Sequence, residues 1–328
     1  MKRSVTLSVA LAAVLLAGCV EKSECEKCGA YSVKVDLGGS PATRAHNVSP
    51  EEDAAVVDCR LYVFDSRGSL VTSLDNASGS FEFYLEKGTY SLDAICNARG
   101  RIVQPTDRSS LLSTVSALAD NSPGSFQMYG CTENLKVDSD LNVTVEVRRL
   151  VAKVQGIVRT KWQSPALAAL PFKVTRIFLT NVQGENNYAR TGWQGDDGLW
   201  YNKRNLASSP VDSLLDSGPM ERLLGDSDSL VTDLSLYPYP NRHADPSDRS
   251  NWSARCTRWV VETQLGDKTC YYPVTLPTVE SNKRYWIDLT VTKPGVKDPE
   301  DIPTEEGYVE VAIKVAPWDE GGTISAKY

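Results

Sequence analysis

Residues and motifs that support catalysis are scarce in this sequence. It holds only two histidines in 328 residues, His46 and His243, and neither stands beside a serine or cysteine in a nucleophile motif. The dinucleotide fingerprint Gly-x-Gly-x-x-Gly, a glycine-rich phosphate loop with lysine, His-Glu-x-x-His and Gly-x-Ser-x-Gly are all missing. We therefore expect no catalytic residue, no metal site and no cofactor, and the sequence predicts a protein that is not an enzyme.

Basic residues are also fewer than acidic residues. The chain has 35 Lys and Arg against 42 Asp and Glu, which gives a formal net charge of −7 at pH 7. Nucleic acids and anionic membrane faces attract basic proteins. No nucleic-acid partner is expected for an acidic chain of this kind.

Long apolar runs are missing as well. The run over residues 4–17 follows two basic residues and is too short to span a bilayer as a helix. It ends in Leu16-Ala17-Gly18-Cys19, the pattern of a bacterial lipobox. Because the basic start, the apolar run and the box are in register, residues 1–18 are predicted to be a lipoprotein signal peptide rather than an ordinary secretory peptide. The exported protein is then anchored to the outer membrane by acyl chains on Cys19.

Seven of the eight cysteines remain once Cys19 carries lipid. Cys25 and Cys28 form a Cys-x-x-Cys pair in a charged tether that lacks the flanking strand and helix of a redox motif and the second ligand pair of a zinc site. Cys59 and Cys96 fall on the apolar faces of two predicted strands. They are either buried thiols, the interpretation we favour, or one inter-strand bridge.

Cys256 and Cys270 flank a predicted hairpin that turns near Gly266-Asp267. In that register residue 256 pairs near position 277 and residue 270 near position 263. These two thiols are therefore not expected to face each other.

Apolar residues alternate with polar ones along most of the chain, which is typical of half-buried strands. Three rows show it most clearly: Tyr31, Val33, Val35 and Leu37; Leu141, Val143, Val145 and Val147; and Val309, Val311, Ile313 and Val315. Further strands are predicted over residues 57–65, 80–85, 89–96, 126–130, 151–160, 172–181, 255–264, 269–276 and 284–291. Many short strands and little helix predict an all-β protein built of sandwiches.

One helix is expected, over residues 109–119, with Leu111, Leu112, Val115 and Leu118 on one face. Residues 183–229 are rich in Gly, Asn, Asp and Ser and are expected to form long loops. A break at Arg148-Arg149 divides the chain into a domain over residues 45–148 and a domain over residues 149–328. Residues 19–44 then hold a tether, the first strand and a linker.

The first strand, over residues 31–37, is set apart from the rest of the chain. It is followed by Gly38-Gly39-Ser40-Pro41-Ala42-Thr43-Arg44-Ala45, a linker of the composition in which proteases cut. This is either an ordinary first strand with a loop after it or a strand meant to be removed.

Several motifs, in order along nearly the whole exported chain, are similar to those of the Bacteroidales fimbrillins. They are Ala42-Thr43-Arg44-Ala45, Leu61-Tyr62-Val63-Phe64-Asp65, Gly88-Thr89-Tyr90, Arg149-Leu150-Val151-Ala152-Lys153-Val154, Tyr237-Pro238-Tyr239-Pro240-Asn241, Thr257-Arg258-Trp259-Val260-Val261-Glu262, Tyr271-Tyr272-Pro273-Val274, Asp288-Leu289-Thr290-Val291-Thr292 and Val315-Ala316-Pro317-Trp318. The chain resembles the major fimbrial subunits, which are type V pilins carried on lipoprotein precursors.

The resemblance implies two transthyretin-like β-sandwich domains in tandem with a removable N-terminal strand. It implies that an arginine-specific surface protease cuts after Arg44 and that the strand with Tyr31, Val33, Val35 and Leu37 then leaves. A strand from the C-terminal segment of a neighbouring copy would fill the vacated groove. The candidate donor row is Val309, Val311, Ile313 and Val315; if that row is the domain's own last strand, the tail over residues 323–328 reaches across instead. The expected product is a cell-surface fimbrium that supports adhesion, with other fimbrial subunits as partners.

Two other functions remain open at this stage. An anchor or accessory subunit of the same fibre would keep its lipid and its first strand. A surface glycan-binding lipoprotein would stack sugars on Trp193, Trp200 and Tyr201, although we favour a role for these rings in capping one end of a sandwich.

Overall fold

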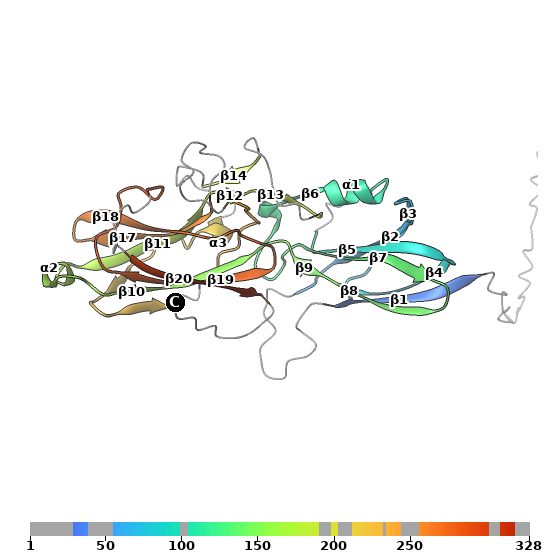
Figure 1. Cartoon of the computed structure of the whole chain (residues 1–328), viewed down its shortest axis with the longest axis horizontal. Coiled ribbons are helices and arrows are strands. Elements are labelled where there is room, and N and C mark those ends of the chain that lie inside the picture. Colours follow the sequence, from blue (N-terminus) through green and yellow to red (C-terminus); the bar gives the residue numbers. More distant parts are fainter. Residues whose placement is uncertain are drawn as a thin grey trace, which may run out of the picture.

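Alternating apolar residues build two pairs of β-sheets that follow each other along the long axis of the molecule (Figure 1). The computed structural model describes residues 29–38, 55–98, 104–189, 198–202, 212–231, 234–243, 256–301 and 309–318. Within this part of the chain, no helix is both long and apolar enough to cross a membrane. The all-β prediction is confirmed.

The N-terminal half contains a three-stranded and a five-stranded sheet. The first has the order β4-β1-β8 and the second β3-β2-β5-β7-β9. The strands are β1 (Ala30–Gly38), β2 (Cys59–Asp65), β3 (Leu70–Asp75), β4 (Ser80–Glu86), β5 (Gly88–Cys96), β7 (Met128–Val137), β8 (Leu141–Glu146) and β9 (Arg148–Arg149). The facing sides of the two sheets bury one apolar cluster, to which Val33 and Val35 of β1 belong. The domain boundary expected at residues 148 and 149 falls inside β9, which pairs with β7.

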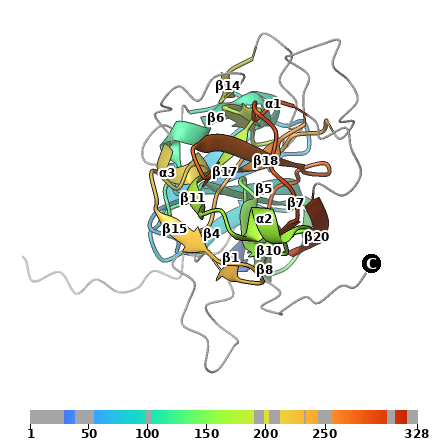
Figure 2. The same cartoon turned by 90° about the vertical axis from the view of Figure 1, so that its left-hand side faces the viewer.

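The C-terminal half contains two four-stranded sheets, with the orders β16-β10-β19-β20 and β15-β11-β17-β18. Figure 2 looks along the long axis from the end that carries α2 and shows β17 and β18 in a layer above β10. The strands are β10 (Lys153–Thr160), β11 (Phe172–Thr180), β15 (Arg222–Leu224), β16 (Ser229–Val231), β17 (Arg258–Leu265), β18 (Lys268–Thr275), β19 (Lys283–Val291) and β20 (Val309–Pro317).

A glycine lets the two layers of the C-terminal half approach each other. A Cβ atom at Gly156 on β10 would lie 2.8 Å from Cζ2 of Trp259 and 3.0 Å from the carbonyl oxygen of Ile287. Trp259 is only 1% exposed. The indole ring therefore occupies the space that a side chain at position 156 would need.

The helix expected over residues 109–119 is shorter than predicted. Helix α1 (Arg108–Ser113) is capped at its start by Asp107, whose side chain accepts a hydrogen bond from the backbone of Ser110. The backbone turns extended at Thr114, and β6 (Val115–Ala117) pairs with β13 (Glu185–Asn187). The prediction was wrong over residues 114–117 because this tertiary pairing, which joins segments far apart in sequence, overrides the local apolar spacing. A single 3₁₀ turn, Leu118–Asp120, follows β6.

The segment expected to consist of long loops holds short elements where the structure describes it. They are β12 (Val182–Gln183), β13, β14 (Trp200–Tyr201), α3 (Asp212–Leu215), β15 and β16; a further short helix, α2 (Pro165–Ala168), precedes β11. Strands of two or three residues are too short to show alternation, which is why the sequence did not reveal them.

Candidate functional site

The first strand, β1, lies in the middle of its sheet. It pairs antiparallel with β4, where Val33 is opposite Phe83, and parallel with β8, where Val35 is opposite Val143. Both of its backbone edges are therefore occupied by partners in the same half of the molecule. Loss of this strand would leave β4 and β8 with unpaired backbone groups along a gap one strand wide.

The predicted apolar row of β1 points into the core of the N-terminal half. Val33 and Val35 are 0% exposed, whereas Tyr31 and Leu37 at the two ends are half-buried. Full burial of a valine side chain contributes about 1.5–3 kcal/mol, so the two central valines hold the strand in place most strongly. Phe83 and Phe81, which lie directly opposite these two valines on β4, are also buried.

The end of β1 fits closely against its surroundings. The backbone N–H of Leu37 donates to the carbonyl oxygen of Gly79 at 3.0 Å, and the N–H of Val147 donates to that of Gly38 at 2.9 Å. A Cβ atom at Gly38 would lie 2.5 Å from Cγ2 of Thr144. A side chain at position 38 would therefore have to displace the exposed side chain of Thr144.

Polar contacts along the outer side of β1 are weaker than its core contacts. The Ser80 hydroxyl donates to Asp36 at 2.7 Å, and the Lys34 ammonium lies 3.6 Å from Glu82 with more than half of each side chain exposed. Exposed ion pairs of this kind contribute about 0–1 kcal/mol. The valines, rather than these charges, decide how firmly β1 is bound.

Three predicted site residues lie outside the described residues: Cys19, Arg44 and Ala45. The four residues of the predicted removable strand are brought together on one face of β1. The four residues of the predicted donor row lie on β20, in the other half of the molecule.

Strand β20 is an edge strand of the C-terminal half in this structure. It pairs antiparallel with β19, where Val311 is opposite Leu289 and Val315 is opposite Tyr285, both of which are 0% exposed. Directly opposed residues share a face of the sheet, so the row faces the interior. Because β20 lies at the edge, Val311 and Val315 nevertheless remain 41% and 45% exposed.

A tryptophan fixes the end of β20 at the junction of the two halves. The Trp318 ring lies 5.9 Å from Phe126 and 5.8 Å from Tyr237, and the guanidinium of Arg149 lies 4.5 Å from its centre. Only 3% of Trp318 is exposed. The sequence motif that ends in Trp318 does not reveal that this residue is an anchor, because the residues that contact its ring are distant in the sequence.

A buried polar network also joins the halves. Gln127 accepts hydrogen bonds from the Ser116 hydroxyl at 2.6 Å and from the Tyr188 hydroxyl at 3.0 Å. The Tyr239 hydroxyl accepts a hydrogen bond from Asn121 at 2.8 Å and also contacts Ser116. One apolar cluster, which includes Phe126 and Tyr239, continues across the same junction. The two halves therefore share part of their core.

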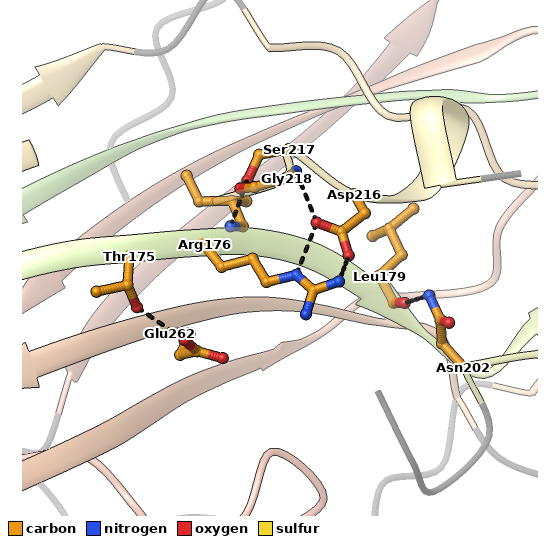
Figure 3. Close-up of polar contacts among 9 residues, drawn as sticks. Thr175, Arg176, Leu179, Asn202, Asp216, Ser217, Gly218 and Glu262 are labelled. Carbon is orange, nitrogen blue, oxygen red and sulfur yellow. Dashed lines mark hydrogen bonds and ion pairs between the residues drawn. The ribbon is translucent and has the colours of Figure 1, made fainter. Parts of the chain in front are cut away.

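A polar cluster on β11 has a structural role. In Figure 3 the Arg176 guanidinium binds the Asp216 carboxylate through two contacts, one of them 2.9 Å long, and Asp216 also accepts from the backbone N–H of Gly218 at 2.8 Å. The N–H of Ile177 donates to the Ser217 hydroxyl at 2.9 Å. These bonds fasten the segment after α3 onto β11.

Trp200 and Tyr201, two of the aromatic residues that could bind a sugar, lie in different surroundings. Tyr201 packs against the main apolar cluster, and a Cβ atom at Gly184 would lie 2.9 Å from its ring. The Trp200 ring is half-buried, 6.5 Å from that of His243. Tyr201 is thus partly buried against the apolar core, while Trp193 lies outside the described residues.

The structure is similar to solved structures of fimbrial and cell adhesion proteins. A fimbrilin (FimA) from Porphyromonas gingivalis W83 is 15% identical, with a TM-score of 0.61 over 88% of this chain and 97% of that one. A candidate cell adhesion protein from Bacteroides eggerthii is 16% identical, with a TM-score of 0.62 over 88% of this chain and 96% of that one.

The tip fimbrial protein Mfa3 of Porphyromonas gingivalis, with a C-terminal truncation, is 13% identical, with a TM-score of 0.50 over 88% of this chain and 100% of that one. No protein-family model and no curated protein matches the chain. At these identities the likeness establishes the fold. The chain has the all-β fold of the Bacteroidales fimbrillins, as its sequence motifs predicted.

Proposed function

We propose that this protein is a structural pilin subunit of a cell-surface fimbrium that supports adhesion, and that it has no enzymatic activity. It is exported as an outer-membrane lipoprotein through Cys19 and cut after Arg44 by an arginine-specific surface protease. The strand β1 then leaves, and the C-terminal segment of a neighbouring copy enters its place. The observation that carries the proposal is the central position of β1 in its sheet.

A strand in this position leaves a receptive groove when it departs. The groove has backbone partners on both sides, from β4 and β8, and an apolar floor that holds the positions of Val33 and Val35. Addition of a strand to free sheet edges, with side chains in matching pockets, is a known mode of protein recognition. An incoming strand with apolar residues at every second position restores both the backbone bonds and the burial.

The row on β20 has the required pattern. Four apolar residues stand at every second position, as in β1, and Val311 and Val315 are 41% and 45% exposed on their own edge. If the row leaves β19 and enters a groove where Val33 and Val35 are 0% exposed, the burial of Val311 and Val315 increases. If β20 instead stays paired with β19 in its own half, the tail over residues 323–328 is the segment that enters the groove. A contact of this kind between the end of one copy and the groove of the next does not close on itself, so it produces a filament.

The test compares cleavage and assembly in two arginine variants. Treatment of the full chain with an arginine-specific protease should produce ladders of oligomers by non-denaturing gel and filaments by electron microscopy. Arg44→Ala should remain monomeric under the same treatment. Arg67→Ala is the matched control, because the Arg67 side chain is 84% exposed and lies in the turn between β2 and β3.

Normal filament formation by Arg44→Ala would contradict the proposal.

The N-terminal residue of the protein found on the cell surface shows which position the subunit takes in the fibre. A start at Ala45 identifies a polymerising stalk subunit. An intact acylated Cys19 with β1 retained identifies an anchor or accessory subunit instead.

A further inference from the structure

Two buried cysteines lie side by side on neighbouring strands of the five-stranded sheet. Cys59 on β2 is directly opposite Cys96 on β5, and they are 3% and 0% exposed. Both belong to the apolar cluster that also contains Val33 and Val35. Opposed residues of an antiparallel pair point to the same face, so both thiols face the core beneath β1.

The position of this pair in the ladder favours a covalent link. The N–H of Asn97 donates to the carbonyl oxygen of Asp58 at 2.9 Å, so the neighbouring pair of residues 58 and 97 is hydrogen-bonded. Hydrogen-bonded and non-hydrogen-bonded pairs alternate, which makes Cys59 and Cys96 a non-hydrogen-bonded pair with Cα atoms about 4.5 Å apart. Disulfides span Cα separations of about 4.4–6.8 Å. A bond between them needs no rearrangement of the backbone.

The two thiols also contact each other. Hydrogen bonding to the Cys59 thiol, together with burial, raises the pKa of the Cys96 thiol. In the structure both are present as thiols.

We propose that Cys59 and Cys96 are a site of oxidation and form a disulfide that ties β2 to β5. A disulfide oxidant, such as oxidised glutathione or a thiol oxidoreductase, accepts two electrons and two protons and is reduced to two thiols, while one S–S bond forms in the protein. Exported proteins meet oxidising conditions of this kind.

The bond would lie in the floor of the groove at the end where β1 finishes. Cys96 is opposite Met128, Met128 is opposite Arg149, and Val147 donates a hydrogen bond to Gly38 at the end of β1. The link therefore holds the floor together both with β1 in place and after its departure. The inference does not rest on strand exchange: without the bond, exchange could still occur, and without exchange the bond could still form.

The chain offers an internal control. Cys256 and Cys270 are also buried, but Cys270 is opposite Thr263 on β17, and Cys256 precedes that strand. Burial and thiol chemistry are similar in the two cases, and only the pairing differs. A bond between Cys59 and Cys96 without one between Cys256 and Cys270 would therefore reflect the register of β2 and β5.

The experiment follows oxidation during refolding, because the folded core shields both thiols. The full chain is unfolded in urea with reductant, refolded with oxidised and reduced glutathione, blocked with N-ethylmaleimide and digested without reduction. Mass spectrometry should find the peptides of Cys59 and Cys96 joined and lighter by two hydrogen atoms, while Cys256 and Cys270 carry the maleimide. Cys256→Ala should leave the linked peptide unchanged.

Maleimide on both Cys59 and Cys96 after refolding with the oxidant would overturn the proposal, as would links that join them to other cysteines. A second measurement uses unfolding in urea with and without reductant. The closed loop of about 40 residues should raise the folded-to-unfolded ratio of the oxidised protein by about 10²–10³-fold. Equal urea midpoints of unfolding for the oxidised and the reduced protein would show that the bond does not tie the sheet together.

Discussion

Substitution of one buried valine on β1 should weaken the uncut protein and leave the filament unchanged. Val35→Ala removes two methyl groups from a side chain that is 0% exposed. At about 0.8 kcal/mol per group, plus the cavity that remains, the free energy of unfolding should fall by about 2–3 kcal/mol. With a urea dependence of about 2–3 kcal/mol per molar, the unfolding midpoint should fall by about 1 M.

The assay is urea unfolding of the uncut protein, followed by urea dissociation of filaments grown after cleavage. Filaments of Val35→Ala and of the unchanged protein should dissociate at the same urea concentration, because β1 is no longer in them. Val71→Ala on β3 is the control, since this valine is 47% exposed and should cost less than about 0.5 kcal/mol. The reasoning would be refuted if Val35→Ala lowered the urea concentration at which filaments dissociate by as much as it lowers the unfolding midpoint of the uncut protein.

Three further predictions concern the C-terminal half and the junction. Trp318→Ala should lower the free energy of unfolding by about 3–5 kcal/mol in urea titrations, and Trp318→Phe by less, because the junction loses a buried ring. Gly156→Ala should lower it by about 1–3 kcal/mol, since the new methyl group meets the Trp259 ring; adding Trp259→Phe should make the costs non-additive in a double-mutant cycle. Burial raises the pKa of Tyr285 to about 12, so folding favours its neutral form, and this contribution is complete below about pH 10 and is lost as pH rises toward 12. Tyr285→Phe should reduce the alkaline slope of stability by at most about 1.4 kcal/mol per pH unit.

The sequence predicted the long strands well because their alternation is a local property. The rows on β1, β8 and β20 all form strands, and the register inferred for Cys270 opposite position 263 is confirmed. β3 was not predicted, because its half-buried residues show no clear two-residue period. The predicted helix is wrong over residues 114–117. There Val115 is 53% exposed and β6 pairs with β13, a contact that local spacing cannot reveal.

The candidate site was predictable in part. The sequence identified the apolar row of β1 and the linker after it, but not that β1 would lie between an antiparallel and a parallel partner. Its neighbours β4 and β8 begin 42 and 103 residues after the end of β1 (80 − 38 and 141 − 38), so only the folded chain brings them together. The processing and lipidation residues, Arg44 and Cys19, remain predictions from motif and composition.

The continuous core between the two halves has a mechanical consequence. Phe126 packs against Tyr237 with ring centres 4.5 Å apart, and both belong to the cluster that crosses the junction. A hinge at this point would have to break apolar contacts and the buried hydrogen bonds from Tyr188 to Gln127 and from Asn121 to Tyr239. In the proposed fibre, each subunit would therefore act as a stiff rod under tension, and the fibre would bend where one subunit meets the next.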